Sequence, residues 1–121
     1  MAEHIDLGKK GEQIALDYLL AKGYKILETN WHFGKNEIDI IARDKNFIVI
    51  VEVKTRVSNY FAEPEMAVTR DKQRTLVNAA NAYVRFKRLN EEVRFDIISI
   101  VIGPEKELIN HIEDAFYPTL M

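Results

Sequence analysis

The sequence has no cysteine, and only three prolines and five glycines among its 121 residues. A chain without cysteine forms neither disulfides nor thiolate-rich zinc sites, and this fits a reducing compartment. The sequence also lacks an amino-terminal apolar segment of the secretory type and any apolar run of membrane-spanning length. From these absences we expect a cytoplasmic protein without a membrane partner.

Neither sign of charge is in large excess, because 17 Lys and Arg face 19 Asp and Glu, for a net charge of -2. Overall charge therefore does not indicate nucleic-acid binding. The charges are unevenly distributed, however. Residues 70–94 carry seven basic and three acidic side chains, and residues 95–121 carry one basic and five acidic ones. This asymmetry permits a basic face, although a solvated helix followed by an acidic end explains it equally well.

The composition that remains, 47% hydrophobic and 30% charged, is typical of one globular domain spanning residues 1–121. Apolar periodicity predicts helices at about 7–22 and 69–87, and strands at about 24–31, 37–43, 47–54, 93–102 and 108–112. Asp6 and Thr69 are suitable N-caps, and Gly23 is a suitable helix stop. The order αβββαββ predicts an α/β fold with a mixed central sheet, in which the first three strands form a meander.

Charged residues interrupt the second and third predicted strands, which are otherwise rich in β-branched residues. Alternation places Glu52 and Lys54 on one face with Ile50. By the same rule Glu37, Asp39 and Ile41 share a face, opposite Ile38 and Ile40. Buried charge is costly unless it is paired or bound to a metal. Asp39, Glu52 and Lys54 could thus converge as a site for a hard divalent cation such as Mg²⁺.

Polar residues also lie within the apolar stripes of both predicted helices. Gly8 and Gly11 weaken the first helix, so we expect a close approach of a strand or ligand on the side that carries Glu12. Glu12 either faces a site or reaches water from the edge of the stripe. Gln73 lies near the middle of the second helix's stripe, and it is either a site residue or an amide bonded to nearby backbone.

Two further interpretations concern loops. His32 could be a metal ligand or proton carrier, although a lone loop histidine is more often a surface residue. The irregular stretch of residues 57–68 is a candidate mobile loop, in which Tyr60 and Phe61 either stack on bases or anchor the loop to the core.

Asp39 followed by Glu52-Val53-Lys54 resembles the signature of the PD-(D/E)XK nuclease superfamily. The wider context resembles the YraN-like family of uncharacterised bacterial proteins from about residue 7 to residue 100. The shared segments are Gly8–Glu12, Glu37–Asp39, Val51–Arg56 and Arg94–Asp96. Asn36 and Ala62 depart from the family, which usually has glycine there. The resemblance implies a restriction-endonuclease-like core.

This resemblance also implies an activity, the Mg²⁺- or Mn²⁺-dependent hydrolysis of nucleic-acid phosphodiesters. Its Holliday-junction-resolvase branch points to DNA, including branched DNA. Asp39 and Glu52 would bind one cation, and Glu12 a second cation or a metal-bound water. Lys54 would stabilise the attacking hydroxide or the phosphorane charge, and Gln73 would orient Lys54 or the water. The carbonyl of Val53 is a further candidate ligand.

Basic residues around this site would contact the nucleic acid, and the candidates are Lys9, Arg56, Arg70 and Lys72. Glu37 is either a spare ligand or a partner of Arg56 or Lys54.

Cutting both strands would require a homodimer, for which the sequence shows no interface. Two other function classes remain open: a module that grips nucleic acid without cutting it, and an interaction protein with structural ion pairs. Carboxylates near phosphates argue against the first.

Overall fold

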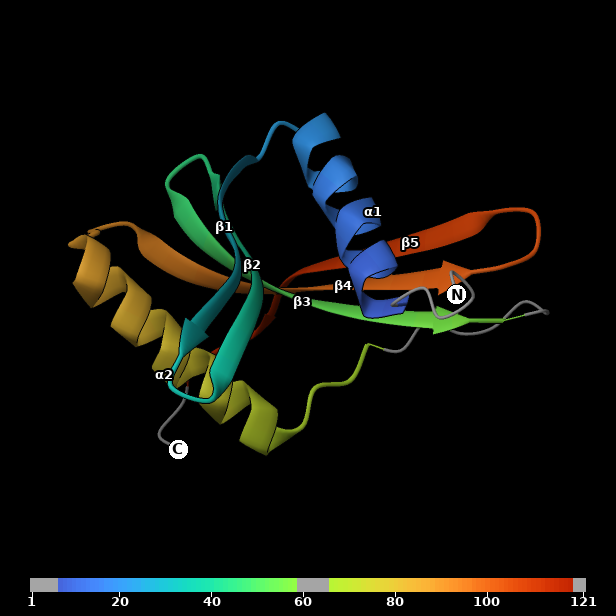
Figure 1. The fold of residues 1–121 in the computed structure, drawn as a ribbon. Helices are drawn as coiled ribbons and strands as arrows, with labels where there is room; N and C mark the ends of the chain where they lie inside the picture. The colour runs from blue at the N-terminus through green and yellow to red at the C-terminus, as the bar shows by residue number, and fades with distance from the viewer. Residues whose placement is uncertain (1–6, 59–65, 119–121) are drawn as a thin grey trace.

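The computed structural model describes residues 7–58 and 66–118. Two helices and five strands follow in the order αβββαββ, which confirms the predicted α/β fold with helices flanking a mixed sheet (Figure 1). The elements are α1 (Leu7–Ala21), β1 (Lys25–Phe33), β2 (Asn36–Asp44), β3 (Phe47–Val57), α2 (Arg70–Lys87), β4 (Glu92–Ile102) and β5 (Glu107–Phe116). Neither helix is both long and apolar enough to cross a membrane.

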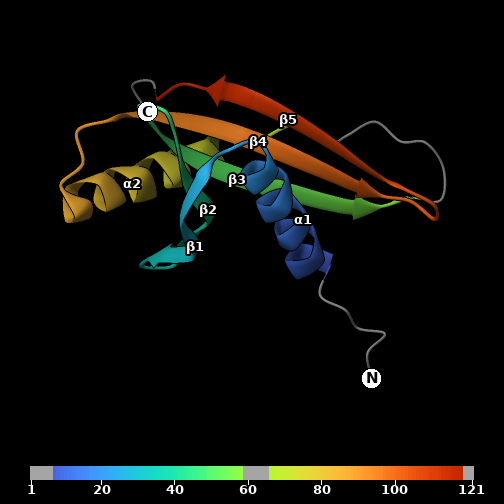
Figure 2. The ribbon, with the colours of Figure 1, turned by 90° about the horizontal axis from the view of Figure 1, so that it is seen from above.

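The five strands form one sheet in sequential order, β1-β2-β3-β4-β5. The first three are an antiparallel meander, α2 makes the crossover to β4, and β4 runs parallel to β3 before β5 returns antiparallel. In Figure 1, α1 crosses the middle of the sheet and α2 lies beside the β1–β2 hairpin. Figure 2, turned by 90°, shows β3, β4 and β5 as long curved strands.

Each helix covers its own face of the sheet with a separate apolar cluster. The α1 cluster contains Ala15, Leu19, Tyr24, Ile40, Ala42, Val49, Val51, Ile98 and Ile100. The α2 cluster contains Ile38, Ile41, Ile48, Ile50, Leu76, Ala79, Ala80, Tyr83 and Phe95. β3 contributes to both, and β4 is buried continuously from Arg94 to Val101, as expected for central strands covered on both faces.

The predicted alternation along β2 is wrong at one point. Ile38 and Ile40 were expected to share a face, but Ile40 packs under α1 while Ile38 and Ile41 pack under α2. Two features accompany this break. β2 pairs with β3 only from Ile40 to Asp44, and Asn30 on the neighbouring β1 has a positive φ of 49°. Asp39 therefore lies where the strand changes its orientation.

β5 is longer than the predicted strand at 108–112. It pairs with β4 from Glu107 to Ile112. After an irregularity, pairing resumes at Phe116. Asp114, in the irregular part, has a positive φ of 57°. The strand was predicted too short because the polar residues of this edge strand interrupt the apolar alternation on which the prediction depended.

The structure confirms two helix boundaries. The Thr69 hydroxyl accepts a hydrogen bond from the Lys72 N–H at 3.1 Å and so caps α2. Gly23, just beyond α1, adopts a φ of 92° that suits glycine. The predicted cap Asp6 and the loop residues Tyr60 and Phe61 lie outside the described residues.

A buried ionic network joins β4 and β5 to Tyr24, just before β1, and to Asp44 at the end of β2. Asp96 is 1% exposed and accepts hydrogen bonds from the Arg94 guanidinium at 2.9 and 3.0 Å, and its Oδ2 lies 2.7 Å from His111 Nε2. Arg94 also donates to Tyr24 at 2.7 Å and to Asp44 at 3.1 Å. Arg94 was counted within the basic stretch 70–94, but these contacts remove it from any exposed basic face.

At Gly11 the backbone of α1 comes close to β3, which confirms the close approach expected at this glycine. A Cβ there would lie 1.7 Å from Thr55 Oγ1 on β3.

We expect Gly11→Ala to destabilise the protein by about 1–3 kcal/mol, because the added methyl group forces α1 away from β3. Urea unfolding measures this. The control is Gln13→Ala on the exposed side of α1, and an equal stability of the two variants would contradict the prediction.

Candidate active site

Asp39 and Glu52 meet where β2 separates from β3. The Asp39 carboxylate turns toward β3 and accepts a hydrogen bond from the Val53 N–H at 2.9 Å. Glu52 precedes Val53 on the same strand. The two acids expected to converge from neighbouring strands are thus brought together, and we call them the acid pair.

The Glu52 side chain is only 14% exposed, and its Oε1 is buried without a hydrogen-bond partner. The Lys72 ammonium, from the first turn of α2, lies 3.8 Å from this oxygen, too far for a hydrogen bond. Lys72 was expected to contact nucleic acid, yet its position also makes it the counter-charge of Glu52. An orphaned carboxylate oxygen in a buried place is one that a bound group would satisfy.

Burial is the main cause of the perturbed acidity of the acid pair. Burial, and after it the charge of Glu52, raise the pKa of Asp39, the hydrogen bond from Val53 opposes them, and the result is a pKa of about 7. Burial also raises the pKa of Glu52, opposed by the positive charges of Lys72 and Lys54. Ionising both carboxylates is therefore unfavourable, and a cation between them would relieve that cost.

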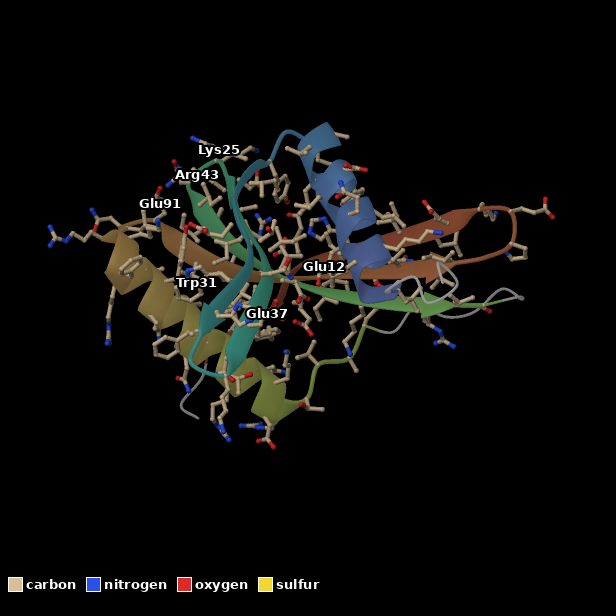
Figure 3. All side chains as sticks on the ribbon, viewed as in Figure 1. Glu12, Lys25, Trp31, Glu37, Arg43 and Glu91 are labelled. Atoms are coloured by element: carbon tan, nitrogen blue, oxygen red, sulfur yellow. The ribbon has the colours of Figure 1, made fainter. Side chains whose placement is uncertain are left out.

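Glu12 approaches the acid pair from α1. Its Oε1 accepts a hydrogen bond from Asn30 Nδ2 at 2.9 Å, and its charge is one of the causes that raise the pKa of Asp39. Figure 3 shows Glu12 on the side of α1 that faces the β1–β2 hairpin. Glu12 and Asp39 line a polar hollow of about 270 Å³ together with Lys9, Gln13, Leu16, Thr29, Asn30 and Ile40.

The other predicted site residues lie at different distances from the acid pair. Lys54 is half-buried on β3 and its charge acts on Glu52. Gln73 donates to the Val68 carbonyl at 3.0 Å, which is the backbone alternative considered above, so its role in orienting Lys54 stays a prediction. The carboxylate of Glu37 lies 3.8 Å from His32 Nε2, and both side chains are exposed.

The residues expected to contact nucleic acid surround this region unevenly. Lys9 is exposed and lines the hollow beside Glu12. Arg56 is exposed near the end of β3, and Arg70 is exposed at the start of α2. Their contact with nucleic acid stays a prediction.

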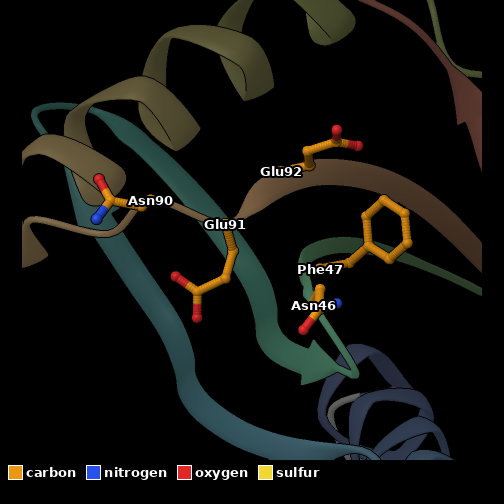
Figure 4. Close-up of a pocket in the computed structure, with 5 residues that line it drawn as sticks. All are labelled: Asn46, Phe47, Asn90, Glu91 and Glu92. Carbon is orange, nitrogen blue, oxygen red and sulfur yellow. The ribbon is translucent and has the colours of Figure 1, made fainter.

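A second, larger hollow of about 510 Å³ lies away from the acid pair, at the β2–β3 turn and the start of β4 (Figure 4). It is lined by Asn46, Phe47, Asn90, Glu91 and Glu92. Its best candidate for chemistry, the Glu91 carboxylate, already pairs with Arg43 at 2.8 Å. The size of this hollow therefore does not make it the better site.

The acid pair suits a cation that needs few protein ligands. The described residues contain no group of three or more His, Asp or Glu positioned to hold a metal. Mg²⁺ is commonly held by one or two carboxylates and retains several waters. Two half-buried carboxylates, one with a buried and unpaired oxygen, match that requirement.

Sequence reasoning missed two contacts of the site, those of Asn30 with Glu12 and of Lys72 with Glu52. Asparagine's tolerance of positive φ was a usable signal for Asn30, since it is enriched in that conformation. No local signal exists for the approach of Lys72, because α2 is placed by packing rather than by pattern.

The fold is similar to that of a solved nuclease. The structure of Hjc, a Holliday junction resolvase of Archaeoglobus fulgidus, superposes with a TM-score of 0.54. The match covers 87% of this chain and 75% of that one at 17% sequence identity, so it shows a shared fold alone.

Sequence comparison gives much closer relatives. A protein of Flavobacterium psychrophilum is 53% identical over 117 residues, covering 97% of this chain and 98% of its own length. A protein of Thermodesulfovibrio yellowstonii is 50% identical over 113 residues, covering 93% of this chain and 97% of its own. Both are described as UPF0102 proteins. The model of the uncharacterised protein family UPF0102 matches residues 11–100. The chain therefore belongs to the UPF0102 family, the YraN-like family that its motifs resemble.

Proposed function

We propose that this protein is a divalent-metal-dependent endonuclease that hydrolyses phosphodiester bonds of DNA. The observation that carries the proposal is the acid pair, two half-buried carboxylates of raised pKa that meet where β2 and β3 separate. Glu52 Oε1 has no hydrogen-bond partner of its own. A resolvase-like fold supports the substrate class, since the similar solved protein is a Holliday junction resolvase.

The residues of the chain would divide the work as follows. Asp39 and Glu52 would hold Mg²⁺ or Mn²⁺, which when bound supplies Lewis acidity and neutralises phosphate charge. Glu12, held by Asn30 at the other side of the hollow, would orient a water molecule. Lys54 would stabilise negative charge that develops on the phosphate. Lys9, Arg56, Arg70 and Lys72 would hold the nucleic-acid backbone near these groups.

The direct test is cleavage of duplex, four-way-junction and single-stranded DNA with Mg²⁺, Mn²⁺ or EDTA. We expect cleavage of at least one substrate with metal and none in EDTA. Glu52→Gln keeps the size of the side chain but removes its charge, and we expect a loss of roughly 100-fold or more, as for other electrostatic catalytic groups. The control is Glu107→Gln, an exposed acid of β5. Equal metal-dependent cleavage by wild type and Glu52→Gln would reject the site.

Two strand cuts at a junction would require two copies of the site, and we infer that a homodimer acts on such substrates. Light scattering with and without a four-way junction measures the number of chains. A protein that stays monomeric on the junction and still cuts both strands would contradict the dimer without affecting the site.

A further inference from the structure

Two buried side-chain oxygen atoms without a hydrogen-bond partner belong to residues of the neighbouring strands β3 and β4. Within residues 7–58 and 66–118, Glu52 Oε1 and Ser99 Oγ are the buried side-chain oxygen or nitrogen atoms that have none. Ser99 is fully buried in the middle of β4. Most buried polar atoms in proteins are hydrogen-bonded, and exceptions often mark functional groups or places where a ligand completes the bonding.

The register places Ser99 beside Lys54. β3 and β4 are parallel, with Lys54 opposite Ser99 and Glu52 opposite Ile97. Earlier partners in the same register, Ile50 and Phe95, both pack under α2, so these alternate positions share that face of the sheet. Ser99 and Lys54 are therefore neighbours on one face, with backbones about 4.8 Å apart.

Ser99 differs from Asp96, another residue of β4 whose side chain is polar and almost completely buried. Both carboxylate oxygens of Asp96 have partners in the Arg94 network. The Ser99 hydroxyl has none, although alanine or valine would fill this position in an apolar strand without leaving a polar atom unpaired. The hydroxyl beside Lys54 thus calls for a reason other than packing.

We propose that Ser99 is a positioning residue, whose hydroxyl accepts a hydrogen bond from the Lys54 ammonium when a divalent cation occupies the acid pair. This inference rests on the proposed function. Without the cation, the ammonium charge interacts with Glu52. A bound cation repels the ammonium from that carboxylate, and Ser99 Oγ is the neighbouring buried acceptor on the same face. Ser99 then keeps Lys54 beside the phosphate site.

The first test observes Lys54 directly, without a nucleic-acid substrate. The side-chain ammonium signal of Lys54 is recorded by ¹⁵N NMR during Mg²⁺ titration and assigned by its loss in Lys54→Arg. We expect Mg²⁺ to slow hydrogen exchange of this ammonium in wild type and in Ser99→Thr, which keeps a hydroxyl, but not in Ser99→Ala. An equal response in Ser99→Ala, or no response in wild type, would overturn the proposal.

The second test is a double-mutant cycle on cleavage. Ser99→Ala is expected to lower kcat about tenfold with little change in KM, the effect of one hydrogen bond to a charged group. In a Lys54→Met background the same substitution is expected to change nothing further, because Ser99 acts through Lys54. Independent, multiplying losses would overturn the proposal.

The two tests separate this inference from the proposed function. If wild type cleaves no substrate, the proposed function fails, and the NMR comparison still decides whether Ser99 binds the ammonium. Thermal unfolding is the check on folding. We expect Ser99→Ala to be at least as stable as wild type, because it removes an unpaired buried hydroxyl. Should Ser99→Ala unfold, the cycle is run with Ser99→Cys, a weak hydrogen-bonding group of similar size.

Discussion

Replacing Asp96 by alanine is expected to cost about 3–5 kcal/mol in the free energy of unfolding, as for other buried ion pairs that lose one partner. The substitution leaves the Arg94 guanidinium buried, with Asp44 as its remaining carboxylate within 3.5 Å. It also removes the acceptor of the Asp114 N–H at 3.0 Å and the contact with His111. Guanidinium chloride unfolding of both proteins at pH 7 measures the loss.

The matched control for Asp96→Ala is Glu113→Gln, at the exposed end of the same network. Its side chain is 49% exposed and lies 3.8 Å from Arg94, so we expect a change within about 0.5 kcal/mol. Similar effects of the two substitutions would show that the network contributes little. Such a result would locate the stability of β4 in its apolar neighbours instead.

The same network predicts how acid affects the protein. Asp96 has a lowered pKa, because hydrogen bonds from His111, Arg94 and Asp114 outweigh the opposing effect of burial. A carboxylate whose folded pKa lies below its unfolded value stabilises the fold above the unfolded value, near pH 4. That contribution is lost as the pH falls through the folded value, and it is absent in Asp96→Ala. The stability difference between the two proteins is therefore expected to shrink below pH 4.

Replacing Asp39 by asparagine is expected to act in the opposite direction and stabilise the metal-free protein at pH 8. The pKa of Asp39 is raised from 3.8 to about 7, and so the ionised carboxylate opposes folding. A shift of that size is worth about 4 kcal/mol, and we expect a gain of about 2 kcal/mol because the new amide N–H groups need partners. The amide oxygen can still accept from Val53.

The pH dependence of this gain follows from the sign of the shift. A folded pKa above the unfolded one gives full stability below about pH 4, and stability declines as the pH rises to about 7. Asparagine does not titrate, so the advantage of Asp39→Asn grows over that window and vanishes below it. Thermal unfolding at several pH values measures it, with Asp17→Asn on the exposed side of α1 as the control.

Divalent metal is expected to reverse the order of stability of wild type and Asp39→Asn. A cation that binds only the folded protein stabilises it by mass action, and the asparagine variant has lost one of the two proposed ligands. With several millimolar Mg²⁺ the melting temperature of wild type should rise while that of Asp39→Asn stays unchanged. The variant should also lose cleavage. A variant that is less stable than wild type at pH 8 without metal would contradict the origin given for the raised pKa. If the prediction holds, wild type is less stable than the variant without metal because its ionised carboxylates are kept for metal binding.

The sequence predicted the elements and the acid pair for different reasons. Each helix and most strands have a periodic apolar face of their own, which is a local property. Asp39 and Glu52 stood out because charge inside apolar strands needs compensation. The faces of β2 could not be predicted, since they depend on where β3 stops pairing and on the backbone of Asn30.

Contacts between segments that are distant in the chain also could not be predicted from the sequence. The hydroxyl of Tyr18 lies 3.2 Å from His111 Nδ1 across 93 positions of the chain, and no pattern in either segment encodes that meeting. Ser99 was counted as one member of an alternating strand. Its importance depends on which residue of β3 stands next to it, and that is fixed only by the register of a parallel pair.

The change of orientation along β2 has a consequence for how the gene tolerates insertions and deletions. Ile40 and Ile41 are fully buried under opposite helices, so deleting one residue between Ile40 and Asp44 would exchange the two faces of the strand and disturb the packing under both helices. The tip at Gly34 and Lys35 is exposed and carries no such penalty. Length variation in this hairpin should therefore be confined to its tip, and the acidic side chain where β2 and β3 separate keeps its place while the tip varies.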